Sequence, residues 1–121
     1  MASVHMIVGT LVLLGYLGLT IAYFRGTQGH EFAQVKMLSQ LAGAVIVVQW
    51  ALGFGLLFSS DDRPNAIHYV FALATILTVG AEHSMALPEK DPIKRNRLGM
   101  YAAAGTFILA LIAYIIGEST S

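Results

Sequence analysis

The distribution of charge divides the chain into four long uncharged stretches. No Lys, Arg, Asp or Glu occurs within residues 1–24, 37–60, 64–81 or 98–117. Each stretch is about long enough for a helix to cross a hydrocarbon core of roughly 30 Å. A spanning segment must satisfy its backbone hydrogen bonds internally, which favours helices. The sequence therefore predicts an all-α fold, a four-helix transmembrane bundle with helices over about 3–25, 33–59, 64–87 and 96–117 in a single domain, residues 1–121.

Composition agrees with this interpretation and excludes several functions. Hydrophobic residues make up 56% of the chain and charged residues only 12%, which is not the composition of a soluble domain. The chain has no cysteine, so disulfides, thiolate metal sites and thiol nucleophiles are excluded. The net charge is zero, which argues against binding to nucleic acid.

The positions of the cations predict the orientation in the membrane. The connections between the uncharged stretches are short, so consecutive helices should be antiparallel, in an up-down-up-down order. The side that would hold both termini carries only Arg63, and the other side carries Arg25, Lys36, Lys90, Lys94, Arg95 and Arg97. By the positive-inside rule, we expect both termini outside, in the periplasm, and the basic loops in the cytoplasm. This is the topology of a multi-pass protein of the inner (cell) membrane.

With this topology the four histidines fall into two pairs. His5 and His68 begin the first and third helices near the outer surface, and His83 and His30 lie near the inner surface. Two imidazoles at matched depth on facing helices can bind one metal. A structural zinc prefers four ligands, whereas a haem iron leaves two axial positions for the protein. The pattern predicts one haem b held by His5 and His68, with His30 and His83 as the candidate ligands of a second.

Helix geometry gives the two pairs a common purpose. On an ideal helix His68 and His83 lie about 22 Å apart and roughly 60° apart in rotation, so both can face the interior of one bundle. Two irons would then be stacked about 20 Å apart across the membrane. Such a stack could carry electrons from one face to the other.

Other residues fit a flat cofactor between helices, and each also has an ordinary explanation. Gly9 lies one turn from His5 and would let a macrocycle approach, although glycines also serve helix packing. Arg63 near the outer pair, and Arg25 or the cluster 94–97 near the inner pair, could hold propionates. Glu82, next to His83, is expected to extend its carboxylate to the membrane interface.

Residues 47–76, "VVQWALGFGLLFSSDDRPNAIHYVFALATI", resemble the repeating half of haem A synthases. That family has a Gln-x-x-Leu-Gly run in one helix, a loop with Pro, and an Ala-x-x-His run opening the next helix. The run "VHMIVG" resembles the helix that supplies the other haem ligand. The resemblance covers the first three helices, and it implies a half-length four-helix bundle with one haem held by His5 and His68. The matching residues here are Gln49, Leu52, Gly53, Pro64 and His68, with Ala66 one residue too close to the histidine.

Departures from that family limit what the resemblance implies about activity. Ala2 and Met6 stand where the family has Glu and Arg, and the cysteine pair of many members is absent. The resemblance thus favours a haem-binding electron carrier over an enzyme. We expect a cytochrome subunit that transfers electrons within or beside a larger membrane complex, in contact with lipid and other subunits and with a quinone as a candidate partner. The alternatives are a cofactor-free accessory subunit, a bacteriochlorophyll-binding structural subunit and a half-length haem-modifying enzyme.

Overall fold

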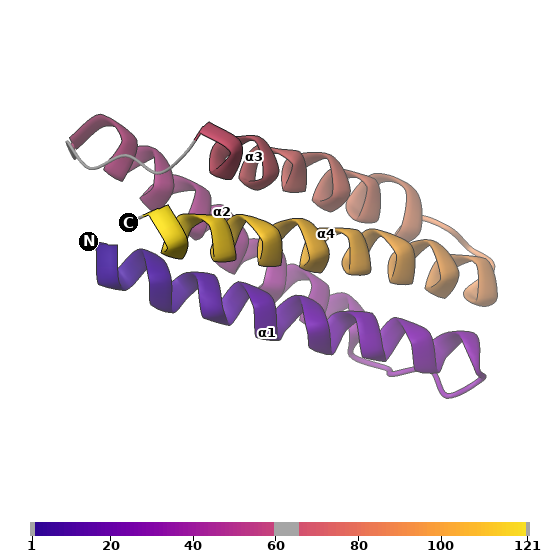
Figure 1. The fold of residues 1–121 in the computed structure, drawn as a ribbon. Coiled ribbons are helices and arrows are strands. Elements are labelled where there is room, and N and C mark those ends of the chain that lie inside the picture. The colour runs from indigo at the N-terminus through magenta and orange to yellow at the C-terminus, as the bar shows by residue number, and fades with distance from the viewer. Residues whose placement is uncertain (1, 60–65, 121) are drawn as a thin grey trace.

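The structure is a computed structural model that describes residues 2–59 and 66–120. It is all-α in these residues, as the sequence predicts, and Figure 1 shows four long helices side by side with the N and C labels at the same end. The third helix continues without a break into one turn of π-helix, η1. The elements are α1 (Ala2–Thr27), α2 (Val35–Ser59), α3 (Ala66–Ala81), η1 (Glu82–Ala86) and α4 (Pro92–Thr120).

All four helices are long and apolar enough to cross a membrane, counting α3 together with η1. Large apolar side chains point outward along them, including Phe58, which is 81% exposed, and Leu77, which is 76% exposed. In water such a surface would be strongly unfavourable, whereas in a bilayer it contacts lipid. The chain is therefore a multi-pass membrane protein.

Helices α1 and α4 together form the centre of the packing. Helix α1 packs along both α4 and α2, and α3 packs along the other side of α4 (Figure 1). The buried side chains of α1 recur at helical spacing and form one stripe. Side chains from α2 and α4 close the core around this stripe, which comprises Val12, Tyr16, Leu19 and Tyr23.

Two threonine hydroxyls of α3 accept hydrogen bonds from other helices in the middle of the bundle, one from α2 and one from α4. The indole Nε1 of Trp50 on α2 donates to Oγ1 of Thr75 at 3.0 Å. Oγ1 of Thr106 on α4 donates to Oγ1 of Thr78 at 2.6 Å. In an apolar medium these polar groups have no water to bond with, so the bonds fix the neighbouring helices in register.

Helix α4 begins four residues before the start expected from hydropathy, because Asp91 and Pro92 form its first turn. The backbone N–H of Ile93 donates to Oδ1 of Asp91 at 3.3 Å, so Asp91 caps the helix. Pro92 then occupies a first-turn position, where a missing N–H costs nothing. Pro92 therefore starts α4, whereas hydropathy predicts a start at about residue 96 and leaves Pro92 in the connection.

The C-terminal end of α1 is closed by a glycine. Gly29 has φ of +88°, a left-handed conformation that favours glycine. The N–H of His30 donates to the carbonyl oxygen of Arg25 at 2.9 Å, which satisfies a carbonyl that the helix leaves open. This turn directs residues 28–34 back toward α2.

Candidate functional site

The structure brings together two of the predicted site residues, His5 and His68. They lie in the first turns of α1 and α3, and their ring centroids are 6.4 Å apart with the ring planes at 82°. Both side chains are partly buried. The two imidazoles therefore meet across the bundle although α1 and α3 each pack mainly against α4.

Their separation suits a metal held between them. A metal in line between two imidazoles lies about 2 Å from each nitrogen, and each nitrogen is about 1.1 Å from its ring centre, so the centres are about 6 Å apart. Edge-to-face packing of two rings falls in the same range of distance. The ring separation therefore does not distinguish a metal site from ring packing. The hydrogen bonds of the two rings provide that distinction.

The hydrogen bond of His68 leaves one ring nitrogen available. Nδ1 of His68 is 2.6 Å from the carbonyl oxygen of Ala113 on α4. A carbonyl oxygen can only accept, so Nδ1 carries the proton and the neutral ring presents a lone pair at Nε2. This is the arrangement in which metal-binding histidines are usually held, with the second nitrogen donating to a carbonyl or carboxylate.

His5 is held less completely. Gln49 of α2 lies beside it, within reach of a side-chain hydrogen bond. Neither Nδ1 of His5 nor Oε1 of Gln49 has a hydrogen-bond partner of good geometry among the described residues, although both atoms are buried.

Glycines border three of the histidine rings. A Cβ at Gly53 would lie 3.4 Å from Cε1 of His5, and a Cβ at Gly117 would lie 3.0 Å from Nδ1 of His68. The ring of His83 lies in the same way against Gly43. Gly9, the residue expected to make room for a cofactor, instead lies against the side chains of Gln49 and Tyr114. It serves the packing of α1 on its neighbours.

The second predicted pair, His30 and His83, occupies two different environments. His30 is exposed in the connection after α1. The side chain of His83 is 36% exposed, with Nε2 3.9 Å from Oε1 of Glu82. Among the described residues no ring contact joins these two imidazoles, and no three His, Cys, Asp or Glu side chains gather into a metal-binding group.

The basic residues proposed for propionates also differ in their surroundings. Arg95 forms an ion pair with Glu31, and Nζ of Lys94 lies 3.7 Å from Oε2 of Glu89. Arg25 is exposed and borders a cleft on the surface. Arg63 lies outside the described residues.

Glu82 corrects the expectation that its carboxylate reaches the membrane interface. Its side chain is fully buried. Oε2 accepts hydrogen bonds from the hydroxyl of Tyr23 on α1 and from that of Ser39 on α2, each at 2.6 Å. Oε1 is buried without a hydrogen-bond partner among the described residues. Burial replaces exposure here because two hydroxyl donors on other helices supply the bonds that water would give.

The π-helix accounts for the position of Glu82. The N–H of Leu87 donates to the carbonyl oxygen of Glu82 at 3.0 Å, five residues back. The wider turn leaves Glu82 and Ala86 both buried in the bundle. Sequence reasoning missed the partners of Glu82, although Tyr16 and Tyr23, two turns apart on α1, gave a signal that one face of that helix is polar.

Comparison of the chain with protein-family models, with curated proteins and with solved structures gave no match.

Proposed function

We propose that this protein is a b-type cytochrome subunit of a membrane electron-transfer complex, with His5 and His68 as the axial ligands of one haem. The observation that carries the proposal is the hydrogen bond from Nδ1 of His68 to the carbonyl oxygen of Ala113, which leaves Nε2 as the nitrogen that can bind a metal. The 6.4 Å separation of the two ring centroids is compatible with a metal between the imidazoles. Since the porphyrin supplies four nitrogens, two histidines suffice for a haem iron and would not suffice for a structural zinc.

Each residue of the pair has a defined task in this proposal. The carbonyl oxygen of Ala113 accepts a hydrogen bond from Nδ1 of His68, which fixes the tautomer and leaves Nε2 as the nitrogen that would bind the iron. Gln49 is the corresponding orienting residue for His5. A haem bound there would supply a one-electron redox centre near one end of the bundle. The proposal is restricted to one haem, because His30 and His83 lie in unlike environments.

An absorption spectrum of the purified protein tests the proposal. We expect a low-spin haem spectrum that changes on reduction with dithionite, because both axial positions are filled. His5→Ala and His68→Ala each open one position and should give a high-spin spectrum or no haem. His30→Ala is the matched control and should keep the native spectrum. If both single variants at positions 5 and 68 retain a full low-spin spectrum, the site is not the one described. A spectrum of bacteriochlorophyll would favour the pigment-binding alternative instead.

We further propose that both termini face the periplasm and the basic connections face the cytoplasm, with the haem near the periplasmic surface. The unequal division of cations supports this orientation. The chain has no cysteine, so single cysteines can report it. Ser3→Cys should react with an impermeant maleimide in intact cells, and Lys90→Cys should react only after the membrane is opened. The reverse pattern would contradict the orientation. Both positions are exposed, unlike Asn96 in the same basic segment, which is buried.

A further inference from the structure

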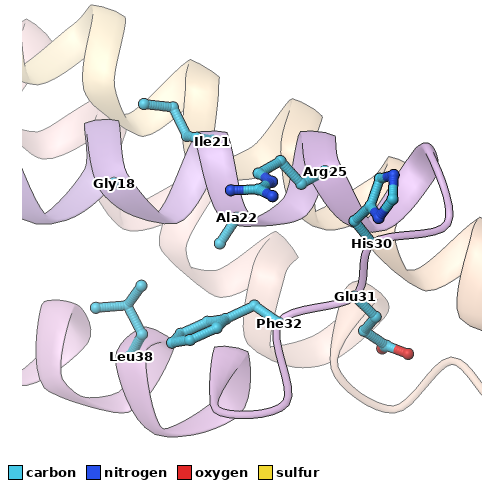
Figure 2. Close-up of a pocket in the computed structure, with 8 residues that line it drawn as sticks. All are labelled: Gly18, Ile21, Ala22, Arg25, His30, Glu31, Phe32 and Leu38. Carbon is cyan, nitrogen blue, oxygen red and sulfur yellow. The ribbon is translucent and has the colours of Figure 1, made fainter.

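A cleft with a volume of about 580 Å³ lies between the C-terminal part of α1 and the start of α2. Its α1 side includes Gly18, Ile21 and Ala22, and its α2 side includes Leu38 (Figure 2). The connection between the helices closes one end. The volume is within the range of pockets that hold small organic ligands.

The polar end of this cleft is positively charged. Figure 2 shows the side chain of Arg25 extending back over the cleft, with His30 beside it at the same end. Arg25 has no side-chain hydrogen bond or ion pair in the part of the chain that the structure describes. The one carboxylate of the lining, Glu31, points away from the cleft and is paired with Arg95 of α4. The cleft thus presents an unneutralised guanidinium.

The opposite end of the cleft is apolar and shallow. Gly18, Ile21 and Arg25 lie three and four residues apart on α1, so they share one face of that helix. Gly18 and Arg25 are about 10 Å apart along the axis, with Arg25 at the end next to the polar connection. Leu38 and the ring of Phe32 face this stripe from the other side. The cleft therefore changes from cationic to apolar in the direction from the membrane surface toward its centre.

We propose that this cleft binds one anionic phospholipid, with the headgroup phosphate at Arg25 and an acyl chain along Gly18, Ala22 and Leu38. The polarity gradient matches that of a lipid in the adjoining leaflet, where a phosphate lies at the interface and a chain points inward. Arginine binds phosphate through two parallel hydrogen bonds, and here no carboxylate competes for it. A neutral quinone would fit the apolar part but would not use the charge of Arg25, so charge complementarity favours the phospholipid.

Native mass spectrometry of the purified full-length protein, titrated with phosphatidylglycerol or with phosphatidylcholine, tests the headgroup. One phosphatidylglycerol should bind more tightly than phosphatidylcholine. In Arg25→Gln the preference should fall by about fivefold, the contribution of one cation near an anionic surface. Arg97→Gln removes an exposed cation of the same basic end that does not line the cleft, and it should keep the preference.

A second variant tests the acyl part without altering charge. A Cβ at Gly18 would meet nothing within 4 Å, so Gly18→Leu fills the cleft without displacing the backbone. It should abolish tight binding of phosphatidylglycerol. Gly80 of α3 is equally open and lies away from the cleft, so Gly80→Leu is the matched control and should bind normally.

Three outcomes would overturn the proposal. Equal affinity for the two lipids would contradict the preference for an anionic headgroup, and normal binding in Gly18→Leu would place the lipid elsewhere. Displacement of phosphatidylglycerol by decylubiquinone, with equal quinone binding in Arg25→Gln, would assign the cleft to a quinone. Inorganic phosphate should not compete at millimolar concentration, because it lacks the acyl chain. The circular dichroism spectrum, which reports the helices, serves as a folding control in each variant.

Discussion

At the end of the bundle where α1 begins, His5 and His68 face each other with a single firm side-chain hydrogen bond, from Nδ1 of His68 to the backbone of α4. Toward the opposite end, Glu82 is buried and accepts two short hydrogen bonds from α1 and α2. Both regions place polar side chains inside an apolar bundle. At the histidine end, Nε2 of His68 remains available to a ligand. At the carboxylate end, the hydroxyl donors of Tyr23 and Ser39 are already bonded to Oε2 of Glu82.

This difference supports the proposal that the histidine end binds a cofactor, whereas the carboxylate end maintains the fold. An ionisable group at membrane depth is costly unless it has partners, and it commonly marks a functional site. Glu82 has partners from two helices, so its main effect is to hold α1, α2 and η1 together. Nδ1 of His5 has no hydrogen-bond partner among the described residues, and His68 uses only its Nδ1 in the hydrogen bond to α4. Three predictions test this division.

The largest effect is expected on haem content. His68→Ala should lower the haem-to-protein ratio from about one, or leave any retained haem high-spin, because it removes an axial ligand. His83→Ala, a histidine-to-alanine change toward the other end, should leave the ratio unchanged. The pyridine haemochrome assay measures both. A ratio near two in the native protein, falling by one in His83→Ala and in His30→Ala, would instead establish a second haem. It would contradict the proposal that only the His5 and His68 end of the bundle binds haem.

A smaller effect, on stability, is expected from Glu82. Glu82→Leu leaves the hydroxyls of Tyr23 and Ser39 without their acceptor, so we expect the free energy of unfolding to fall by about 1–3 kcal/mol. Glu82→Gln keeps a carbonyl oxygen for both donors and should cost less. Unfolding in detergent, followed by circular dichroism, measures the two.

The haem spectrum sharpens this second prediction. If Glu82 is structural, haem bound to folded Glu82→Leu should keep its low-spin spectrum. Loss of that spectrum without loss of stability would show that the carboxylate acts on the cofactor. Glu89→Gln is a suitable control, because that carboxylate is partly exposed and pairs only with Lys94.

The smallest effect is expected from the ion pair of Arg95 with Glu31, which joins α4 to the connection after α1. Both side chains are partly exposed, so Arg95→Gln should lower the free energy of unfolding by only about 0.2–1 kcal/mol. The difference from the native protein should shrink in 1 M salt, where charges are screened within about 3 Å. A salt-independent loss above that range would mean that the pair is part of the core.

Sequence reasoning gave the four helices because hydropathy and charge act locally along the chain. It also identified His5 and His68 as one pair, since both residues begin a helix at the same end. It did not identify the role of Glu82, because the partners Tyr23 and Ser39 lie 59 and 43 residues away in the chain. Nor did it give the start of α4. Asp91 is polar and Pro92 usually breaks a helix, but in the structure Asp91 caps α4 and Pro92 is its first residue.

The sequence by itself determined that this is an all-α protein with four membrane-length helices, because the transfer of each apolar segment into lipid depends on that segment alone. It also determined that His5 and His68 lie at the N-terminal ends of the first and third helices. Only the tertiary structure decided which side chains meet. The π-turn at Glu82–Ala86 and the packing of α1 against both α2 and α4 set the rotation of each helix. Rotation, which hydropathy does not specify, brings His5 to His68, buries Glu82 and leaves Arg25 at an open cleft.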